Sequence, residues 1–157
     1  MANFSFAVGI QGSASRAFYP LFAVKLLIPD DKLMRKSKIL LIDDEPGLLR
    51  LMTLMLNFRD RYEVRSVADA TKALSAVVEF KPDLVLLDWI MPKMNGGEVA
   101  QQIRADSRVC ATRILFLSAI IMKRDNPGEL AGYPAVAKPI GLQELVEAIE
   151  EQLLKAA

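Results

Sequence analysis

The sequence contains no histidine, and this absence excludes several kinds of chemistry. Ser-His and Cys-His catalysis, histidine metal ligands and a phosphohistidine carrier all need an imidazole. The single cysteine, Cys110, excludes a disulfide framework and a cysteine-based zinc site within one chain. So little cysteine also suits a reducing cytoplasm. An enzyme that depends on histidine is therefore excluded.

An excess of one charge and a long apolar run are also missing. The 157 residues include 20 basic and 19 acidic side chains, so a formal net charge of +1 gives no basic field for nucleic acid. The apolar stretch 17–24 is interrupted by Lys25 and is shorter than the roughly 20 residues that span a bilayer. We expect a cytoplasmic protein that inserts into no membrane and contacts no nucleic acid directly.

Two regions of different character divide the chain. Residues 1–36 lack the regular pattern of the rest and are interpreted as an N-terminal extension that is loosely ordered or not native. Residues 37–157 have the length of one domain with its own core. This second region alternates short apolar runs with amphipathic segments, which predicts strands at 38–42, 63–67, 83–87, 113–117 and 134–137 and helices at 46–58, 70–80, 96–105 and 142–154. Between the last two strands, residues 125–132 have room for at most a short helix.

Alternating strands and helices predict a doubly wound α/β fold, with a five-stranded parallel sheet and helices on both faces. The expected strand order is 2-1-3-4-5, whose switch point lies between the first and third strands. Polar side chains end four of these strands: Asp43 and Asp44, Asp88, Ser118, and Lys138. All of them are therefore expected at one edge of the sheet, where such folds bind ligands.

Three neighbouring carboxylates repel one another unless a cation neutralises them, and oxygen ligands of this kind suit Mg²⁺. Lys138 adds a positive charge and Ser118 a hydroxyl. Phosphoryl transfer needs mainly positioning and charge neutralisation, which these groups supply. Asp88 is the candidate nucleophile, and its product would be an aspartyl phosphate.

Four motifs carry a resemblance to a known family. They are K-I-L-L-I-D-D-E-P, P-D-L-V-L-L-D-W-I-M-P-K-M-N-G-G, I-L-F-L-S-A and A-K-P-I, and together they span residues 38 to about 154. With these motifs the chain resembles the response regulator receiver domain of two-component systems, in its stand-alone, single-domain form. The resemblance implies the flavodoxin-like receiver fold and self-catalysed phosphotransfer, with a sensor histidine kinase or a histidine phosphotransfer protein as donor.

The resemblance also implies a role for each site residue. Asp88 is the phosphoacceptor, Ser118 and Lys138 follow the phosphoryl group, and the Mg²⁺ ligands are Asp43, Asp44, Asp88 and the backbone carbonyl of Ile90.

Several departures from the family pattern have consequences. The aromatic residue usual three positions before the lysine is replaced by Ala135, and the stretch 118–138 is short, so the usual switch face is in doubt. Tyr133 is interpreted as an ordinary packing residue. Ile90 and Ile120 stand where family members often have polar side chains that position water, which predicts slow autodephosphorylation.

Three functions are therefore compared. The first is a phosphorylation-activated switch that signals to an unknown downstream protein, with a homodimer left open. The second is a phosphorylation-independent interaction module with the same fold. The third is a flavodoxin-like flavin carrier, which the acidic residues at 43–45 disfavour because they repel phosphate.

Overall fold

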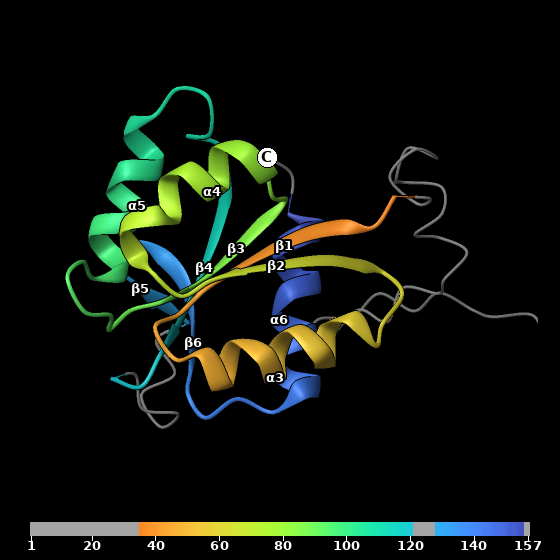
Figure 1. The fold of residues 1–157 in the computed structure, drawn as a ribbon. Coiled ribbons are helices and arrows are strands. Elements are labelled where there is room, and N and C mark those ends of the chain that lie inside the picture. Colours follow the sequence, from red (N-terminus) through yellow and green to blue (C-terminus); the bar gives the residue numbers. More distant parts are fainter. Residues whose placement is uncertain (1–34, 121–127, 156–157) are drawn as a thin grey trace, which may run out of the picture. The chain divides into compact units, whose positions relative to one another are not determined.

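Five parallel strands form the centre of the described chain, which comprises residues 35–120 and 128–155 of the computed structural model (Figure 1). Their order is β2-β1-β3-β4-β6, and a short antiparallel strand, β5, pairs with β6. The strands are β1 (Ser37–Ile42), β2 (Tyr62–Val67), β3 (Leu84–Asp88), β4 (Arg113–Ser118), β5 (Glu129–Leu130) and β6 (Tyr133–Ala137). The predicted order 2-1-3-4-5 is confirmed for the parallel strands.

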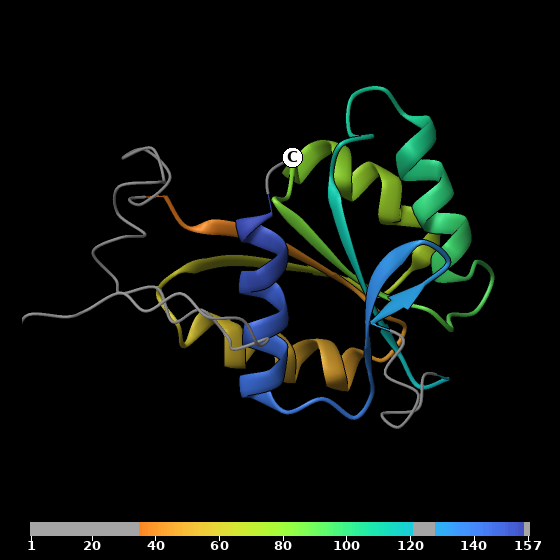
Figure 2. The same ribbon diagram turned by 180° about the vertical axis from the view of Figure 1, so that it is seen from behind.

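Helices cover both faces of this sheet, as the alternating sequence pattern predicts. They are α3 (Pro46–Asn57), α4 (Ala73–Phe80), α5 (Gly96–Ala105) and α6 (Leu142–Leu154), with a 3₁₀ turn, η1 (Ala70–Lys72), before α4. Helices α4 and α5 lie on one face, and α3 and α6 lie on the other (Figures 1 and 2). The fold is therefore the doubly wound arrangement in which ligands bind beyond the carboxyl ends of the strands.

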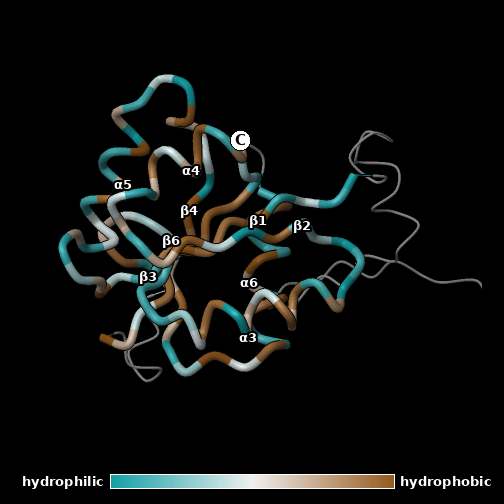
Figure 3. The backbone as a smooth tube through the Cα atoms, in the orientation of Figure 1, coloured by the Kyte–Doolittle hydropathy of each residue, from teal (hydrophilic) through white to brown (hydrophobic). Residues whose placement is uncertain are grey.

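The central strands are apolar at every position because both faces of the sheet are buried. Leu40 and Val85 belong to the hydrophobic cluster beneath α4 and α5, whereas their neighbours Leu41 and Leu86 belong to the cluster beneath α3 and α6. All five residues of β3 are buried. Figure 3 shows this as hydrophobic colour along the strands at the centre of the fold.

Local signals in the sequence explain where the helices begin. Pro46 occupies the first turn of α3, where its missing N–H is not needed. Asn95 caps α5 by accepting a hydrogen bond from the Glu98 N–H at 3.0 Å, and the Glu98 carboxylate accepts one from the Asn95 N–H at 2.8 Å. Asp69 accepts from the Thr71 N–H at 3.2 Å and so caps η1.

The sequence did not predict β5. Residues 121–127 lie outside the described residues, and the described part of the expected short helix, 128–132, contains a strand and a turn instead. Leu130 pairs with Tyr133 across a two-residue loop, Ala131-Gly132, in which φ is +53° and +82°. Positive φ at both positions is the mark of a type I′ hairpin turn, whose twist matches that of the strands it joins.

The predicted extension, residues 1–36, falls almost entirely outside the described residues, so its interpretation stays a prediction. Within 35–120 and 128–155, no helix is both long and apolar enough to cross a membrane.

Ala131 is a non-glycine residue with left-handed backbone angles, so a better-suited residue at this position should stabilise the hairpin turn. Asn accepts positive φ better than Ala does, and Ala131→Asn creates the favoured Asn-Gly pair. We expect this change to raise the free energy of unfolding by about 0.5 to 1 kcal/mol, measured by urea denaturation. The control is Ala111→Asn, at an exposed turn position without positive φ. Equal stability of the two variants would contradict the expectation.

Candidate functional site

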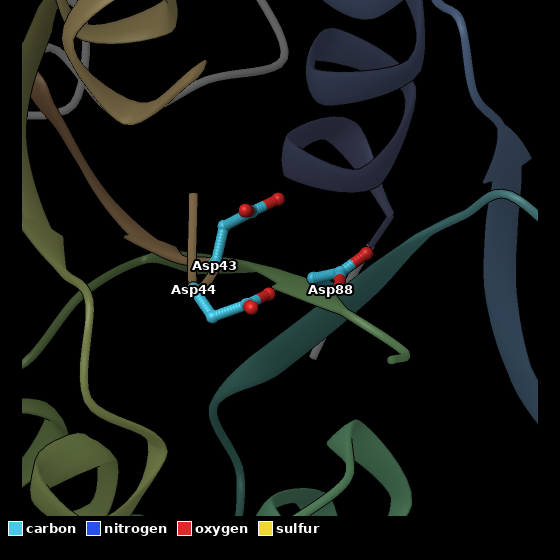
Figure 4. A group of neighbouring side chains, drawn as sticks. All are labelled: Asp43, Asp44 and Asp88. Carbon is cyan, nitrogen blue, oxygen red and sulfur yellow. The ribbon is translucent and has the colours of Figure 1, made fainter. Parts of the chain in front are cut away.

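Three carboxylates meet at the edge where β1 and β3 end. Ile42 and Leu87 are paired in the parallel register of these strands, so the next residues, Asp43 and Asp88, emerge side by side. Asp44 follows, and one oxygen from each of these three aspartates lies within 4.8 Å of the others (Figure 4). Asp43 and Asp88 are buried, whereas Asp44 is exposed.

Lys138 connects two of these carboxylates. Its Nζ donates to Asp43 Oδ2 at 2.5 Å and to Asp88 Oδ1 at 2.7 Å. The backbone holds this lysine in place, because Lys138 N–H donates to the Ser118 carbonyl at 2.9 Å where β4 and β6 end. The structure therefore brings together, from residues 95 positions apart in sequence, the acid and base pair that the sequence pattern predicts at this edge.

Burial and charge shift the protonation of this group. Burial raises the pKa of Asp88, and the negative charges of Asp43 and Asp44 add to that rise, while the hydrogen bond from Lys138 opposes it. Burial by itself lowers the pKa of Lys138, but its hydrogen bonds to Asp43 and Asp88 together outweigh burial and raise that pKa. The buried carboxylates thus keep the lysine charged, and the cluster carries excess negative charge.

The charge and the oxygen ligands of the cluster are suited to a divalent cation. Three carboxylates and one ammonium group leave two uncompensated negative charges, which equal the charge of Mg²⁺. Asp44 has no hydrogen bond from Lys138, so its exposed oxygens are available as ligands. Asp43 is held in position by the Glu45 N–H, which donates to its Oδ1 at 2.9 Å. The role of the Ile90 carbonyl as a further ligand stays a prediction.

Ser118 lies at the same edge as the last residue of β4 and is fully buried. Its Oγ accepts a hydrogen bond from the Ile120 N–H at 3.2 Å. This side chain therefore orders the loop that follows β4, and its predicted contact with a phosphoryl group requires the hydroxyl proton to point away from Ile120.

Gly96 is a residue whose importance the sequence analysis did not recognise. The backbone after Asp88 turns sharply, with the Trp89 carbonyl accepting from the Gly96 N–H at 3.0 Å. A Cβ placed on Gly96 would lie 2.3 Å from the Asp88 carbonyl oxygen, which no side chain tolerates. The Gly-Gly pair at the end of the loop was the available signal, since close backbone approach is a common reason for glycine.

Aromatic rings extend from the site into the core. Trp89, next to Asp88, contacts Phe116 edge to face with ring centroids 5.0 Å apart. Phe116 contacts Tyr133 in the same manner at 5.5 Å. Tyr133 is therefore a half-buried packing residue in a chain of three rings, and Ala135, at the position where the family has its aromatic residue, is buried in the same cluster.

A doubly wound sheet with an acidic cluster and a lysine at the ends of its strands defines a class of signalling domain, and comparison with known proteins identifies it. Residues 39–150 match the response regulator receiver domain family. The chain therefore belongs to this family of two-component signalling domains, in which signals pass by phosphorylation, and not to the flavin carriers that share its fold.

Relatives of known name support this assignment. The chain is 36% identical over 123 residues to the DNA-binding response regulator MtrA of Mycolicibacterium smegmatis, which covers 75% of this chain and 51% of the relative. It is 37% identical over 122 residues to the probable transcriptional regulator ycf27 of Porphyridium aerugineum, and this match covers 76% of this chain and 49% of the relative. The chain thus spans about half the length of the curated relatives it matches.

Solved structures agree with the fold. The chemotaxis response regulator CheY4 of Vibrio cholerae superimposes with a TM-score of 0.66 and 25% identity, covering 75% of this chain and 99% of that one. A putative response regulator from Chloroflexus aurantiacus gives a TM-score of 0.67 and 25% identity, covering 77% and 100%.

Asp44 offers a test of metal binding that leaves the Lys138 ion pairs intact. Asp44→Asn removes one exposed carboxylate, so we expect it to weaken Mg²⁺ affinity by about tenfold or more. The readouts are fluorescence of Trp89, the single tryptophan, and the rise in melting temperature caused by Mg²⁺. The matched control is Asp60→Asn, which removes an exposed carboxylate paired with Lys36. Equal Mg²⁺ stabilisation of both variants would exclude Asp44 as a ligand.

Proposed function

We propose that this protein is a phosphorylation-activated signalling switch in which Asp88 accepts a phosphoryl group from a histidine kinase or a histidine phosphotransfer protein. The observation that supports this most directly is the arrangement of Lys138, whose ammonium group bridges buried Asp43 and Asp88 inside an acidic cluster of Mg²⁺-binding type. An isolated structural ion pair would need one carboxylate, and the additional carboxylates would destabilise it.

The oxygens of Asp88 are not equivalent. Oδ1 accepts from Lys138, whereas no hydrogen bond to Oδ2 is found within residues 35–120 and 128–155. Oδ2 is therefore the candidate nucleophile. It would form an O–P bond while the P–N bond of a phosphohistidine breaks, and the departing imidazole nitrogen keeps the electron pair and takes up a proton.

Each neighbouring group has a role in this step. Lys138 stays charged, and its ammonium group, which donates to Asp88 before the reaction, donates to a phosphoryl oxygen after it. The Ser118 hydroxyl donates to a second phosphoryl oxygen. Mg²⁺ held by Asp43, Asp44, Asp88 and the Ile90 carbonyl would neutralise the negative charge that the carboxylates and the phosphoryl group bring together.

The partners follow from the same reasoning. The donor is a sensor histidine kinase or a phosphotransfer protein, the output is a downstream protein in the cytoplasm or a second copy of this chain, and the near-neutral charge argues against direct nucleic-acid binding by these residues. Named relatives are DNA-binding regulators, but these are about twice as long as the matched region.

A second function, a phosphorylation-independent interaction module, is favoured by two observations. The region between β4 and β6 contains a hairpin strand at 129–130, and Ala135 replaces the aromatic switch residue of the family. The complete set of Asp43, Asp88 and Lys138 contacts favours the phosphorylation switch more strongly.

Phosphorylation by a small donor separates the two functions. With acetyl phosphate and Mg²⁺ we expect one phosphoryl group per chain by intact-mass measurement, because the site itself catalyses the transfer. Asp88→Asn should abolish the label, and Asp60→Asn, an exposed control, should keep it. A protein that stays unlabelled and shows no Trp89 response would be the interaction module.

The lifetime of the phosphorylated form tests the two isoleucines near the site. Ile90 and Ile120 are each 55% exposed and lack a group that positions water for attack on phosphorus. We expect the phosphorylated protein to last longer than seconds. Ile90→Asn should increase the rate of dephosphorylation about threefold to tenfold, measured by loss of the phosphoryl label. The control Leu54→Asn makes the same kind of change at an exposed position on α3 and should leave the rate unchanged. Decay of the unaltered protein within seconds would refute the expectation.

A further inference from the structure

A groove of about 680 Å³ lies at the opposite edge of the sheet from Asp88, where β4 and β6 begin. The end of α5, the first residues of these two strands and the end of α6 contribute its walls. Its charged and apolar lining includes Arg104, Arg113, Ile114, Tyr133, Pro134 and Lys155.

The charge of this groove is one-sided. Three of its lining residues are cationic and none of them is acidic. Lys155 pairs with Glu151 at 3.1 Å, but Arg104 and Arg113 form no ion pair among the described residues. Both arginines are partly buried. Partly desolvated arginines usually have an acidic partner, and these two have none among the described residues.

Backbone carbonyls hold both guanidinium groups in place. Arg104 Nη1 donates to the carbonyls of Cys110 and Thr112, each at 2.7 Å, and its guanidinium carbon lies 5.2 Å from the centre of the Tyr133 ring. Arg113 Nη2 donates to the Lys155 carbonyl at 2.7 Å. A guanidinium has five N–H donors, so each group keeps donors for a ligand without a further loss of side-chain freedom.

We propose that this groove binds a small organic anion, with a phosphate or carboxylate group on Arg104 and Arg113 and an apolar body against Pro134 and the Tyr133 ring. Charge, fixed donors and an apolar wall together select this class of ligand, because guanidinium groups match both kinds of oxyanion. An uncharged ligand would leave the two cations uncompensated.

The groove is also in contact with the ring chain that leads to Asp88. Tyr133 lines the groove and contacts Phe116, and Phe116 in turn contacts Trp89. A ligand that moves the Tyr133 ring therefore acts on packing next to the phosphorylation site. The binding itself does not depend on the proposed function of Asp88.

Isothermal titration calorimetry on the full chain tests this proposal, in a buffer without phosphate and without Mg²⁺ so that the acidic site takes no part. The probes are AMP for a phosphate ester, citrate for a carboxylate, and adenosine as the uncharged match to AMP. We expect AMP, citrate or both to bind saturably and adenosine not to bind. Which of the two anions binds identifies the source of the charge.

Variants distinguish this groove from general attraction of anions. Arg113→Gln should weaken binding by about tenfold or more, and Arg113→Lys, which keeps the charge but loses the planar fork, should fall between. The control Arg65→Gln removes the same charge on β2, where Arg65 pairs with Glu79 at 3.2 Å, and should bind as the unaltered protein does. Circular dichroism verifies that each variant is folded. The proposal is overturned if neither anion binds, if adenosine binds as well as AMP, or if Arg113→Gln binds unchanged.

Discussion

The contact on which this protein depends most is the bridge from Lys138 to Asp43 and Asp88. It connects the ends of β1, β3 and β6, and it places one positive charge among three negative ones. Because the two bridged carboxylates are buried, losing the lysine would leave charges without a partner in a poorly solvated place. The same excess of negative charge that makes the cluster costly for the fold is what suits it to a divalent cation.

The fold supplies the rigidity that such a cluster needs. Strands β1 and β3 are buried on both faces, so their register fixes where Asp43 and Asp88 emerge. The loop after Asp88 is fixed as well, because Gly96 lets the backbone come within a distance that any side chain would prevent. Loop residues at the end of a buried strand therefore behave almost as part of the sheet, and the Asp88 carboxylate has little freedom to move away from Lys138.

The two edges of the sheet differ in charge. The edge with Asp88 is acidic, whereas the edge where β4 and β6 begin presents Arg104 and Arg113 without acidic partners in the described chain. Three aromatic rings, from Trp89 through Phe116 to Tyr133, pass between these regions. In this family an aromatic residue three positions before the lysine usually takes part in switching. Here Ala135 stands at that position, and the nearest aromatic residue in the sequence, Tyr133, lines the basic groove.

The sequence by itself determined the class of fold, the order of the parallel strands and the edge at which the aspartates gather, because these follow from repeating apolar patterns several residues long. Helix starts at Pro46 and Asn95 follow from equally local signals. Only the tertiary structure decided which side chains touch: the double contact of Lys138, the close approach at Gly96, and the groove arginines that have no acidic partner within residues 35–120 and 128–155. It also decided β5, a two-residue strand too short to leave a pattern. Contacts between residues up to 95 positions apart depend on strand register and on side-chain conformation. A short stretch of sequence determines neither of them.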